Sequence, residues 1–258
     1  MKILKVFGAV LVFSLIFIPG AFAQLNKVPN LKLYDFDRLH FGFILAANEM
    51  DFVVETKEDL YLEYFTDLPG DGELLAASAA RINGIRANPS LGFAVGIVGD
   101  MRLGEYFNLR FIPSLTFGKR SLDYYVRLYD ENDVFKTEKL ITKKINSTFL
   151  EFPLLLKYKS KRVHNIRGYV FGGVKFSFDL ASEARKKEQN NYDVKLYGTD
   201  TYGTLGAGFD VYMNWFKFGV ELSMSYGTRD MLLREDNLYT DSIESLRSKI
   251  FLLTFTFE

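Results

Sequence analysis

Apolar residues alternate with small or polar residues along eight separate segments of this chain. The clearest alternation sets Phe216, Phe218, Val220, Leu222, Met224 and Tyr226 against Lys217, Gly219, Glu221, Ser223, Ser225 and Gly227. Successive side chains of a β-strand point to opposite faces, so this pattern predicts strands with one strongly apolar face. The eight segments are residues 39–48, 91–102, 107–118, 147–158, 168–180, 203–213, 216–227 and 249–258.

The length and number of these segments favour a membrane barrel. Each has about 10 to 13 residues, which is close to the roughly 9–11 residues of a tilted membrane-spanning strand. The even number is typical of a closed bacterial barrel, and the small second face fits its narrow interior. We therefore predict an all-β fold, an eight-stranded antiparallel transmembrane β-barrel of the outer membrane. A soluble, lipocalin-like carrier is the alternative.

The connections between the segments alternate strictly between short and long. The short connections are residues 103–106, 159–167 and 214–215, and the long ones are residues 49–90, 119–146, 181–202 and 228–248. Outer-membrane barrels have short periplasmic turns and long outer loops, so the short connections mark the periplasmic end. Five aromatic residues at that end predict a periplasmic girdle: Tyr106, Phe107, Tyr158, Trp215 and Phe216. In the long first loop, the Ala- and Leu-rich residues 73–82 predict a short helix or a partner-docking segment, with simple loop packing as the alternative.

The first residues have the pattern of a secretory signal peptide. Lys2 and Lys5 precede an apolar run, and Ala21-Phe22-Ala23 forms a cleavage site before Gln24. The apolar run is too short to span a bilayer as a helix. We predict a cleaved signal peptide over residues 1–23, a periplasmic segment over residues 24–38 and the barrel over residues 39–258.

Composition narrows the classes of function. The chain has 258 residues, with 32 basic and 32 acidic residues and no cysteine. Zero net charge argues against nucleic-acid binding, which needs clustered excess Lys and Arg. The lack of cysteine excludes disulfides, thiolate metal ligands and a lipid anchor on an N-terminal cysteine. We expect no cofactor and no metal, with outer-membrane lipid and other proteins as partners; the pattern predicts no oligomeric state.

Charged residues also occur on the face predicted to line the lumen. Because an isolated charge inside a narrow barrel is costly, we expect these residues to form ion pairs. The candidates are Arg110, Glu151, Lys157, Lys175, Asp210, Lys217 and Glu221. The alternative, an ion or proton path, has little room in an eight-stranded bore.

Catalytic residues are not predicted. The chain has two histidines, and neither His40 nor His164 falls at the outer rim, where an enzyme acting on surface lipid would work. A Ser–His–acid arrangement needs one of them beside a serine and a carboxylate. An outer-membrane lipid-modifying enzyme is therefore only the alternative to a non-enzymatic barrel.

Four runs resemble the PorT/SprT family of outer-membrane barrels. They are residues 39–52 (LHFGF and MDF at its two ends), 96–113 (GIVGDMRLGEYFNLRFIP), 149–158 (FLEFPLLLKY) and 248–258 (SKIFLLTFTFE). The resemblance spans residues 25–258 and implies a component of the type IX (Por) protein secretion system, which in some bacteria also serves gliding motility. It also implies that the protein partners are other proteins of that secretion system. It carries no catalytic residues. A generic small outer-membrane barrel with a structural or adhesive role is the competing interpretation.

Overall fold

The computed structural model describes residues 30–60, 64–66, 68, 77–182, 194–235 and 237–258. The predicted signal peptide lies outside these residues. Within them, no helix is both long and apolar enough to cross a membrane.

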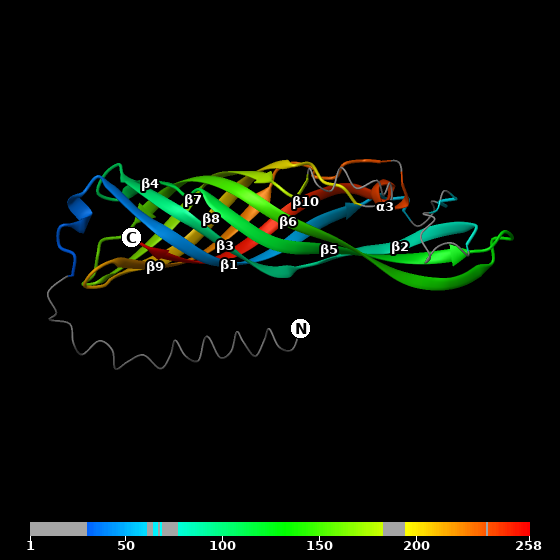
Figure 1. Cartoon of the computed structure of the whole chain (residues 1–258), viewed down its shortest axis with the longest axis horizontal. Helices are drawn as coiled ribbons and strands as arrows, with labels where there is room; N and C mark the ends of the chain where they lie inside the picture. The colour runs from blue at the N-terminus through cyan, green and yellow to red at the C-terminus, as the bar shows by residue number, and fades with distance from the viewer. Residues whose placement is uncertain (1–29, 61–63, 67, 69–76, 183–193, 236) are drawn as a thin grey trace, which may run out of the picture.

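In the described part of the chain, ten antiparallel strands form a single sheet (Figure 1). The strands are β1 (Leu39–Thr56), β2 (Ala79–Asn88), β3 (Ser90–Arg102), β4 (Phe107–Phe111), β5 (Ser114–Tyr129), β6 (Phe135–Lys159), β7 (Ile166–Asp179), β8 (Thr199–Tyr212), β9 (Lys217–Gly227) and β10 (Ile243–Phe257). A 3₁₀ helix, η2 (Tyr34–Phe36), precedes β1, and a short helix, α3 (Leu238–Asp241), precedes β10.

The sheet closes on itself because β1 pairs with β10 on one side and with β3 on the other. Leu45, for example, lies opposite Phe255 of β10 and Val95 of β3. The ten strands cross the barrel wall eight times, and we call each crossing a stave. Two staves contain two strands each, because β3 continues β2 after Pro89 and β5 continues β4 after Pro113. Proline has no N–H for the ladder, which accounts for the interruptions at Pro89 and Pro113. Pro153, by contrast, lies within β6 without interrupting it. The predicted eight-stranded antiparallel barrel is confirmed.

The two faces of the staves differ as the alternation predicts. Along β1, Phe41, Phe43 and Leu45 are exposed on the outer wall, while Ile44 and Ala46 are buried in the lumen. The same division holds on the other staves, and it leaves a belt of large apolar side chains around the barrel. An exposed apolar surface of this extent is stable in hydrocarbon and unstable in water, so the belt is the lipid-facing wall.

Small residues in the wall make room for large lumen side chains. A Cβ placed on Gly208 would lie 2.9 Å from the ring of Tyr169, and one on Gly206 would overlap the ring of Phe171. These two glycines of β8 are therefore packing sites for rings from the neighbouring β7. They let two aromatic side chains fill the bore.

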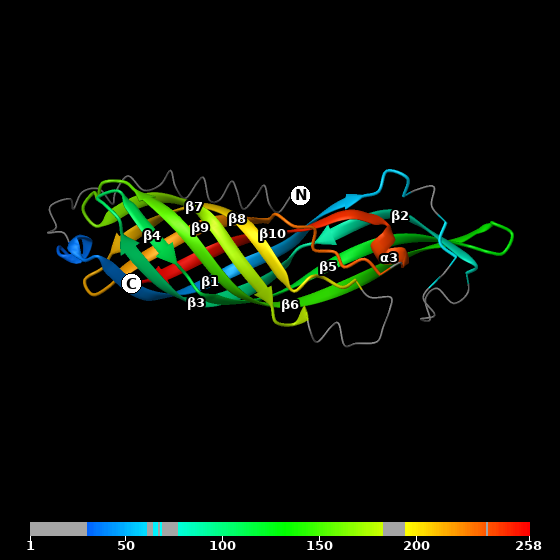
Figure 2. The ribbon, with the colours of Figure 1, turned by 90° about the horizontal axis from the view of Figure 1, so that it is seen from above.

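The long connections were predicted to be loops, and this is wrong for much of their length. The strands β1, β5 and β6 run past the apolar belt, and Ala79–Asn88 forms β2, which pairs with β5. The first four residues of β2 belong to the run expected to form a helix, and they are extended instead; residues 73–76 of that run lie outside the described residues. We call β2, the outer halves of β5 and β6, and α3 the outer extension (Figures 1 and 2).

The outer extension has its own hydrophobic core. The inner face of β5 contributes Leu122, Tyr124, Val126 and Leu128, all buried. Around them pack Ile82 of β2, Ile141 of β6 and a group of residues from the last long connection and β10, namely Met231, Leu232, Leu238, Tyr239, Ile243 and Leu246. The strands therefore persist outside the membrane because this second core buries one of their faces.

We expect Tyr124→Ala to unfold the outer extension locally while the barrel stays intact. The Tyr124 side chain is fully buried; its ring packs at 5.0 Å from that of Tyr239, and its hydroxyl donates to the Tyr239 carbonyl over 3.2 Å. Removing a buried aromatic ring costs about 3–5 kcal/mol. Limited proteolysis in detergent should then cleave within residues 119–146, leaving a protected barrel core.

The matched control is Tyr125→Ala, because the adjacent Tyr125 side chain is on the exposed face of the same strand. It should leave the protease pattern unchanged. Equal protection of both variants would contradict the assignment of a separate outer core.

Candidate functional site

All seven charged residues predicted to line the lumen are buried there, and each takes part in an ion pair. The pairs are Lys157–Asp210 at 2.9 Å, Lys175–Glu151 at 2.7 Å, Lys217–Glu258 at 2.7 Å, and Arg110 with Asp100, Glu221 and Glu258. Thr116 also donates to Glu151, and Tyr169 donates to Glu221 over 2.8 Å. Opposite charges and hydroxyls thus offset the cost of removing these groups from water.

Glu258 is a lumen residue that the sequence reasoning missed. Its carboxylate lies between Arg110 and Lys217, at 3.2 Å and 2.7 Å. It is one residue past the end of β10, yet its backbone still exchanges hydrogen bonds with that of Lys217. The alternation through Thr254 and Thr256 places position 258 on the lumen face, so extending the period by one step would have found it.

Side chains fill the half of the lumen that lies nearer the short-turn end. A cavity of about 50 Å³ lies beside Glu151, Lys175 and Glu221. Between it and the short-turn end, the Lys157 ammonium lies 3.5 Å from the centre of the Tyr169 ring, and Arg110 joins three carboxylates. The described side chains thus leave only small internal space in this half of the barrel.

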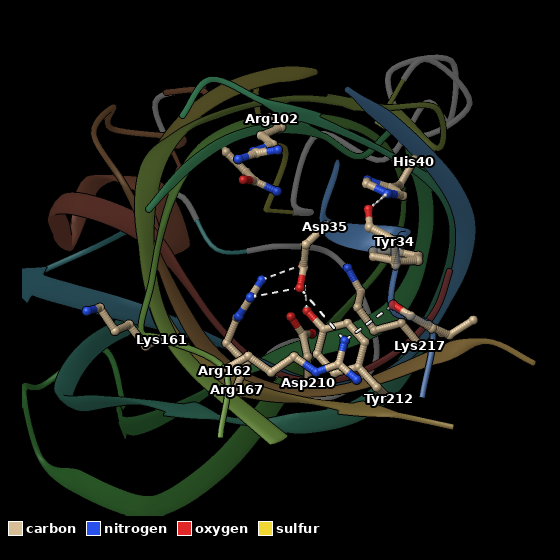
Figure 3. Close-up of polar contacts among 12 residues, drawn as sticks. Tyr34, Asp35, His40, Arg102, Lys161, Arg162, Arg167, Asp210, Tyr212 and Lys217 are labelled. Carbon is tan, nitrogen blue, oxygen red and sulfur yellow. Dashed lines mark hydrogen bonds and ion pairs between the residues drawn. The ribbon is translucent and has the colours of Figure 1, made fainter. Parts of the chain in front are cut away.

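The short-turn end of the barrel is closed by residues 30–38, which fold across its mouth (Figure 3). The η2 turn points Tyr34 and Asp35 inward and leaves Leu33 and Phe36 74% and 72% exposed. The Tyr34 ring stacks on the His40 ring at 3.8 Å, and its hydroxyl donates to Glu258 over 3.1 Å. The His40 side chain donates through Nε2 to the Tyr34 carbonyl over 2.7 Å.

The Asp35 carboxylate lies at the centre of this mouth. Arg167 donates to both of its oxygens, at 2.7 and 3.0 Å, and the Tyr212 hydroxyl donates to Oδ1 over 3.1 Å. The Arg162 guanidinium lies 3.8 Å from Oδ2 and 3.7 Å from the centre of the Tyr212 ring. We call Arg162, Arg167 and Tyr212 the carboxylate seat.

The backbone of the same segment is also bound. Arg162 donates to the carbonyl oxygens of Asn30 and Leu31. The Asn30 N–H donates to the Asn165 side chain over 2.8 Å, and the Asn30 amide donates to the Tyr212 carbonyl over 3.0 Å. The mouth therefore contacts main-chain groups and a carboxylate of one peptide.

The mouth shifts the ionisation of both inward-pointing residues. Burial raises the pKa of Tyr34, and the neighbouring Glu258 carboxylate raises it further, so the phenol stays protonated. Burial alone would raise the pKa of Asp35, but the hydrogen bonds and positive charge of Arg167 outweigh it. The pKa of Asp35 is thereby held below its ordinary value.

The five aromatic residues predicted as a girdle all lie at the short-turn end. Phe107 and Tyr158 are exposed on the outer wall with their rings 5.2 Å apart, and Trp215 is 89% exposed in the turn before β9. Tyr106 lies in the turn before β4, and Phe216 immediately precedes β9. This is the level at which aromatic rings meet a membrane–water interface.

The two histidines also lie at this end. His40 faces the mouth from β1, and His164 lies exposed in the 160–165 turn, with a positive φ of 56°. Among the described residues, no group of three or more His, Cys, Asp or Glu side chains is arranged to hold a metal ion.

Removing one partner of a lumen ion pair should destabilise the barrel strongly. We expect Lys175→Met to cost about 3–5 kcal/mol, because it leaves the Glu151 carboxylate charged and buried without its cation. Lys175→Met/Glu151→Gln should recover most of this loss, since the uncompensated charge is gone. The measurement is urea unfolding of the protein folded into lipid vesicles.

The matched control is Arg127→Met, which removes an exposed ion pair with Glu138 at 3.4 Å. It should change stability by less than about 1 kcal/mol. A double variant no more stable than Lys175→Met would contradict the ion-pair explanation.

Acidification should release residues 30–38 from the mouth. Arg162, Arg167, Lys159 and Tyr212 face Asp35, and all remain protonated in acid, so Asp35 is the titrating group within this cluster. His40 and Glu258 also bond to Tyr34 and can gain protons in acid, so the Asp35→Asn chain described below isolates the contribution of Asp35. Its pKa is lowered on docking, so the docking free energy is fully present near neutral pH. It is lost as the pH falls through the pKa of the docked carboxylate.

A nitroxide attached at Leu33→Cys, the only cysteine in the labelled chain, would report this release as increased mobility below about pH 4. With Asp35→Asn in the same chain, the label should be mobile at every pH. A label that stays immobile down to pH values well below this, with the barrel still folded, would contradict the carboxylate's role.

The family comparison agrees with this architecture. A model of the family described as outer membrane protein beta-barrel domain matches residues 22–233. Among solved structures, the chain is similar to the outer membrane protein OprG from Pseudomonas aeruginosa (14% identity, TM-score 0.39, covering 85% of this chain and 94% of that one). It is also similar to Neisserial surface protein A (9% identity, TM-score 0.40, covering 86% and 99%).

A third similar structure is the N-terminal β-barrel domain of Pseudomonas aeruginosa OprF (11% identity, TM-score 0.26, covering 83% and 97%). No curated protein sequence matches this chain. The family match covers most of the chain, and it coincides with a closed barrel that has an apolar outer wall. The chain belongs to the outer membrane protein β-barrel domain family, and its place is the outer membrane.

Proposed function

We propose that this barrel is a non-enzymatic component of the type IX (Por) protein secretion machinery and acts by binding protein partners. The observation that carries a partner-binding role is the filled lumen. Ion pairs and aromatic rings occupy its lower half, and residues 30–38 cover the mouth below them. A bore of this kind gives an exported protein no passage, so the role falls to the surfaces.

Two surfaces are available for partners. On the outer side, the extension raises a folded β-structure beyond the lipid-facing belt. On the periplasmic side, the mouth combines the exposed apolar side chains of Leu33 and Phe36 with the arginines of the carboxylate seat. Assignment to type IX secretion rests on the resemblance of residues 39–52, 96–113, 149–158 and 248–258 to the PorT/SprT family.

A structural or adhesive barrel is the second candidate. The exposed face of the outer extension favours it, because Arg81 lies 4.0 Å from the centre of the half-exposed Tyr64 ring and Tyr125 is exposed nearby. Exposed Tyr and Arg side chains are common in protein-binding surfaces. This role would need the outer extension and would leave secretion unaffected.

The test is deletion of the gene in its own host. Proteins that carry a C-terminal sorting domain should then accumulate inside the cell, while other outer-membrane proteins stay at normal levels. Expression of the wild-type chain from a plasmid should restore export. Normal export in the deletion strain would overturn the type IX assignment and favour the second candidate.

Purification of the tagged barrel in mild detergent separates the two further. A machinery component should retain other envelope proteins in fixed proportion, and Tyr124→Ala should lose those bound through the outer extension. Arg127→Met, an exposed change on the same strand, serves as the control for overall folding.

A further inference from the structure

We propose that the carboxylate seat is a receptor site for an acidic peptide segment of a periplasmic protein, and that residues 30–38 occupy it as a resident competitor. This inference takes one point from the proposed function, namely that the barrel binds a protein partner in the periplasm. Its physical basis is the contrast between a rigid seat and a detachable occupant.

The seat is built from the barrel wall. Arg167 is in β7 and Tyr212 is in β8, and these two strands are paired along their length. Arg162 lies in the short turn between β6 and β7, where its Nε donates to the His164 carbonyl over 2.7 Å. The donors that face Asp35 therefore keep their positions whether or not residues 30–38 are present.

The occupant is joined to the barrel differently. Residues 30–38 belong to none of the strands, and η2 is a single 3₁₀ turn. Side chains provide most of the bonds that hold this segment, through Arg162, Arg167, Asn165, Tyr212, His40 and Glu258. A segment held in this way can exchange with a second peptide that offers the same groups.

The contacts define what that peptide must carry. Two parallel N–H bonds from Arg167 match the planar geometry of a carboxylate. Asn30 lies five residues before Asp35, and its main chain is bound by Arg162 and Asn165. These main-chain contacts favour a peptide over a free anion. Between these points, the Tyr34 ring fills the space against His40. The matching partner therefore has an aromatic residue directly before an Asp or Glu, in an extended or loosely turned segment.

The test uses the full chain in mild detergent, labelled with a nitroxide at Leu33→Cys. This position is 74% exposed in the docked segment and the chain has no other cysteine. The probe is a synthetic peptide of residues 30–38, and its comparison is the same peptide with Asn in place of Asp35. We expect the first peptide to mobilise the label, and the second to need a concentration about tenfold higher or more.

The Asp35→Asn chain provides a second, independent measurement. In the Asp35→Asn chain, the resident segment competes less well, so the Asp-containing peptide should bind at a concentration about tenfold lower. A dye-labelled peptide detects this binding directly by fluorescence anisotropy. Arg167→Gln should abolish the difference between the two peptides.

Two results would overturn the proposal: equal binding of both peptides, or no binding to the Asp35→Asn chain. Inorganic phosphate is tested in the same way. If phosphate displaces residues 30–38 as effectively as the peptide does, the seat is a general anion site and the proposal is also overturned. These outcomes do not depend on the secretion assay. Peptide exchange with normal export would leave this inference standing and reject the type IX assignment.

Discussion

The pairing of β1 with both β3 and β10 is the contact on which the rest of the structure depends. In hydrocarbon every backbone N–H and C=O needs a partner within the protein, and an open sheet would leave two edges unpaired. Closing the sheet after eight staves satisfies the ladder but fixes a narrow interior. Most large apolar side chains are then on the outer wall, and the lumen combines glycine, serine and threonine with a limited number of larger residues such as Tyr169 and Phe171.

Two different cores result from this closure. The lumen combines a small apolar cluster around Ile44 and Phe171 with buried charges. Each charge is matched within hydrogen-bonding distance, as in Lys157–Asp210 and Lys175–Glu151, which offsets its desolvation cost. In the outer extension stability comes from burial of Leu122, Tyr124 and their neighbours, as in a water-soluble protein. The two cores share long strands, since β5 and β6 run continuously from one into the other. A change at the base of these strands is therefore felt on both sides of the lipid boundary.

Much of the barrel could be predicted from the sequence, because a period of two is a local signal. The alternation in β9 or β1 identifies the stave, its lipid-facing side and its lumen charges at once. The outer extension was mistaken for loops because its strands mix buried residues with charged ones, as in residues 119–129, and resemble solvated connections. The inner face of β5 could be identified only through the residues near 231–246 that cover it, and no local pattern links the two.

The site at the mouth was harder to predict for a related reason. The lumen ion pairs can be predicted because alternate residues of each strand face the lumen. Glu258 follows from extending the same alternation by two residues beyond Thr256. Asp35, by contrast, lies outside any periodic segment, and its partner Arg167 is 132 positions away in the chain. Arg167 and Tyr212 are on predictable strands, but nothing in either strand indicates that a peptide from before β1 would lie across them.

The placement of residues 30–38 has a consequence for assembly. These residues precede every strand, yet their partners Arg167, Tyr212 and Glu258 come from β7, from β8 and from the position after β10. The segment cannot reach its final position until the last stave has paired with the first. Docking of residues 30–38 in this position therefore follows closure of the barrel, and an immobile residue 33 shows that the last strand has already paired with the first.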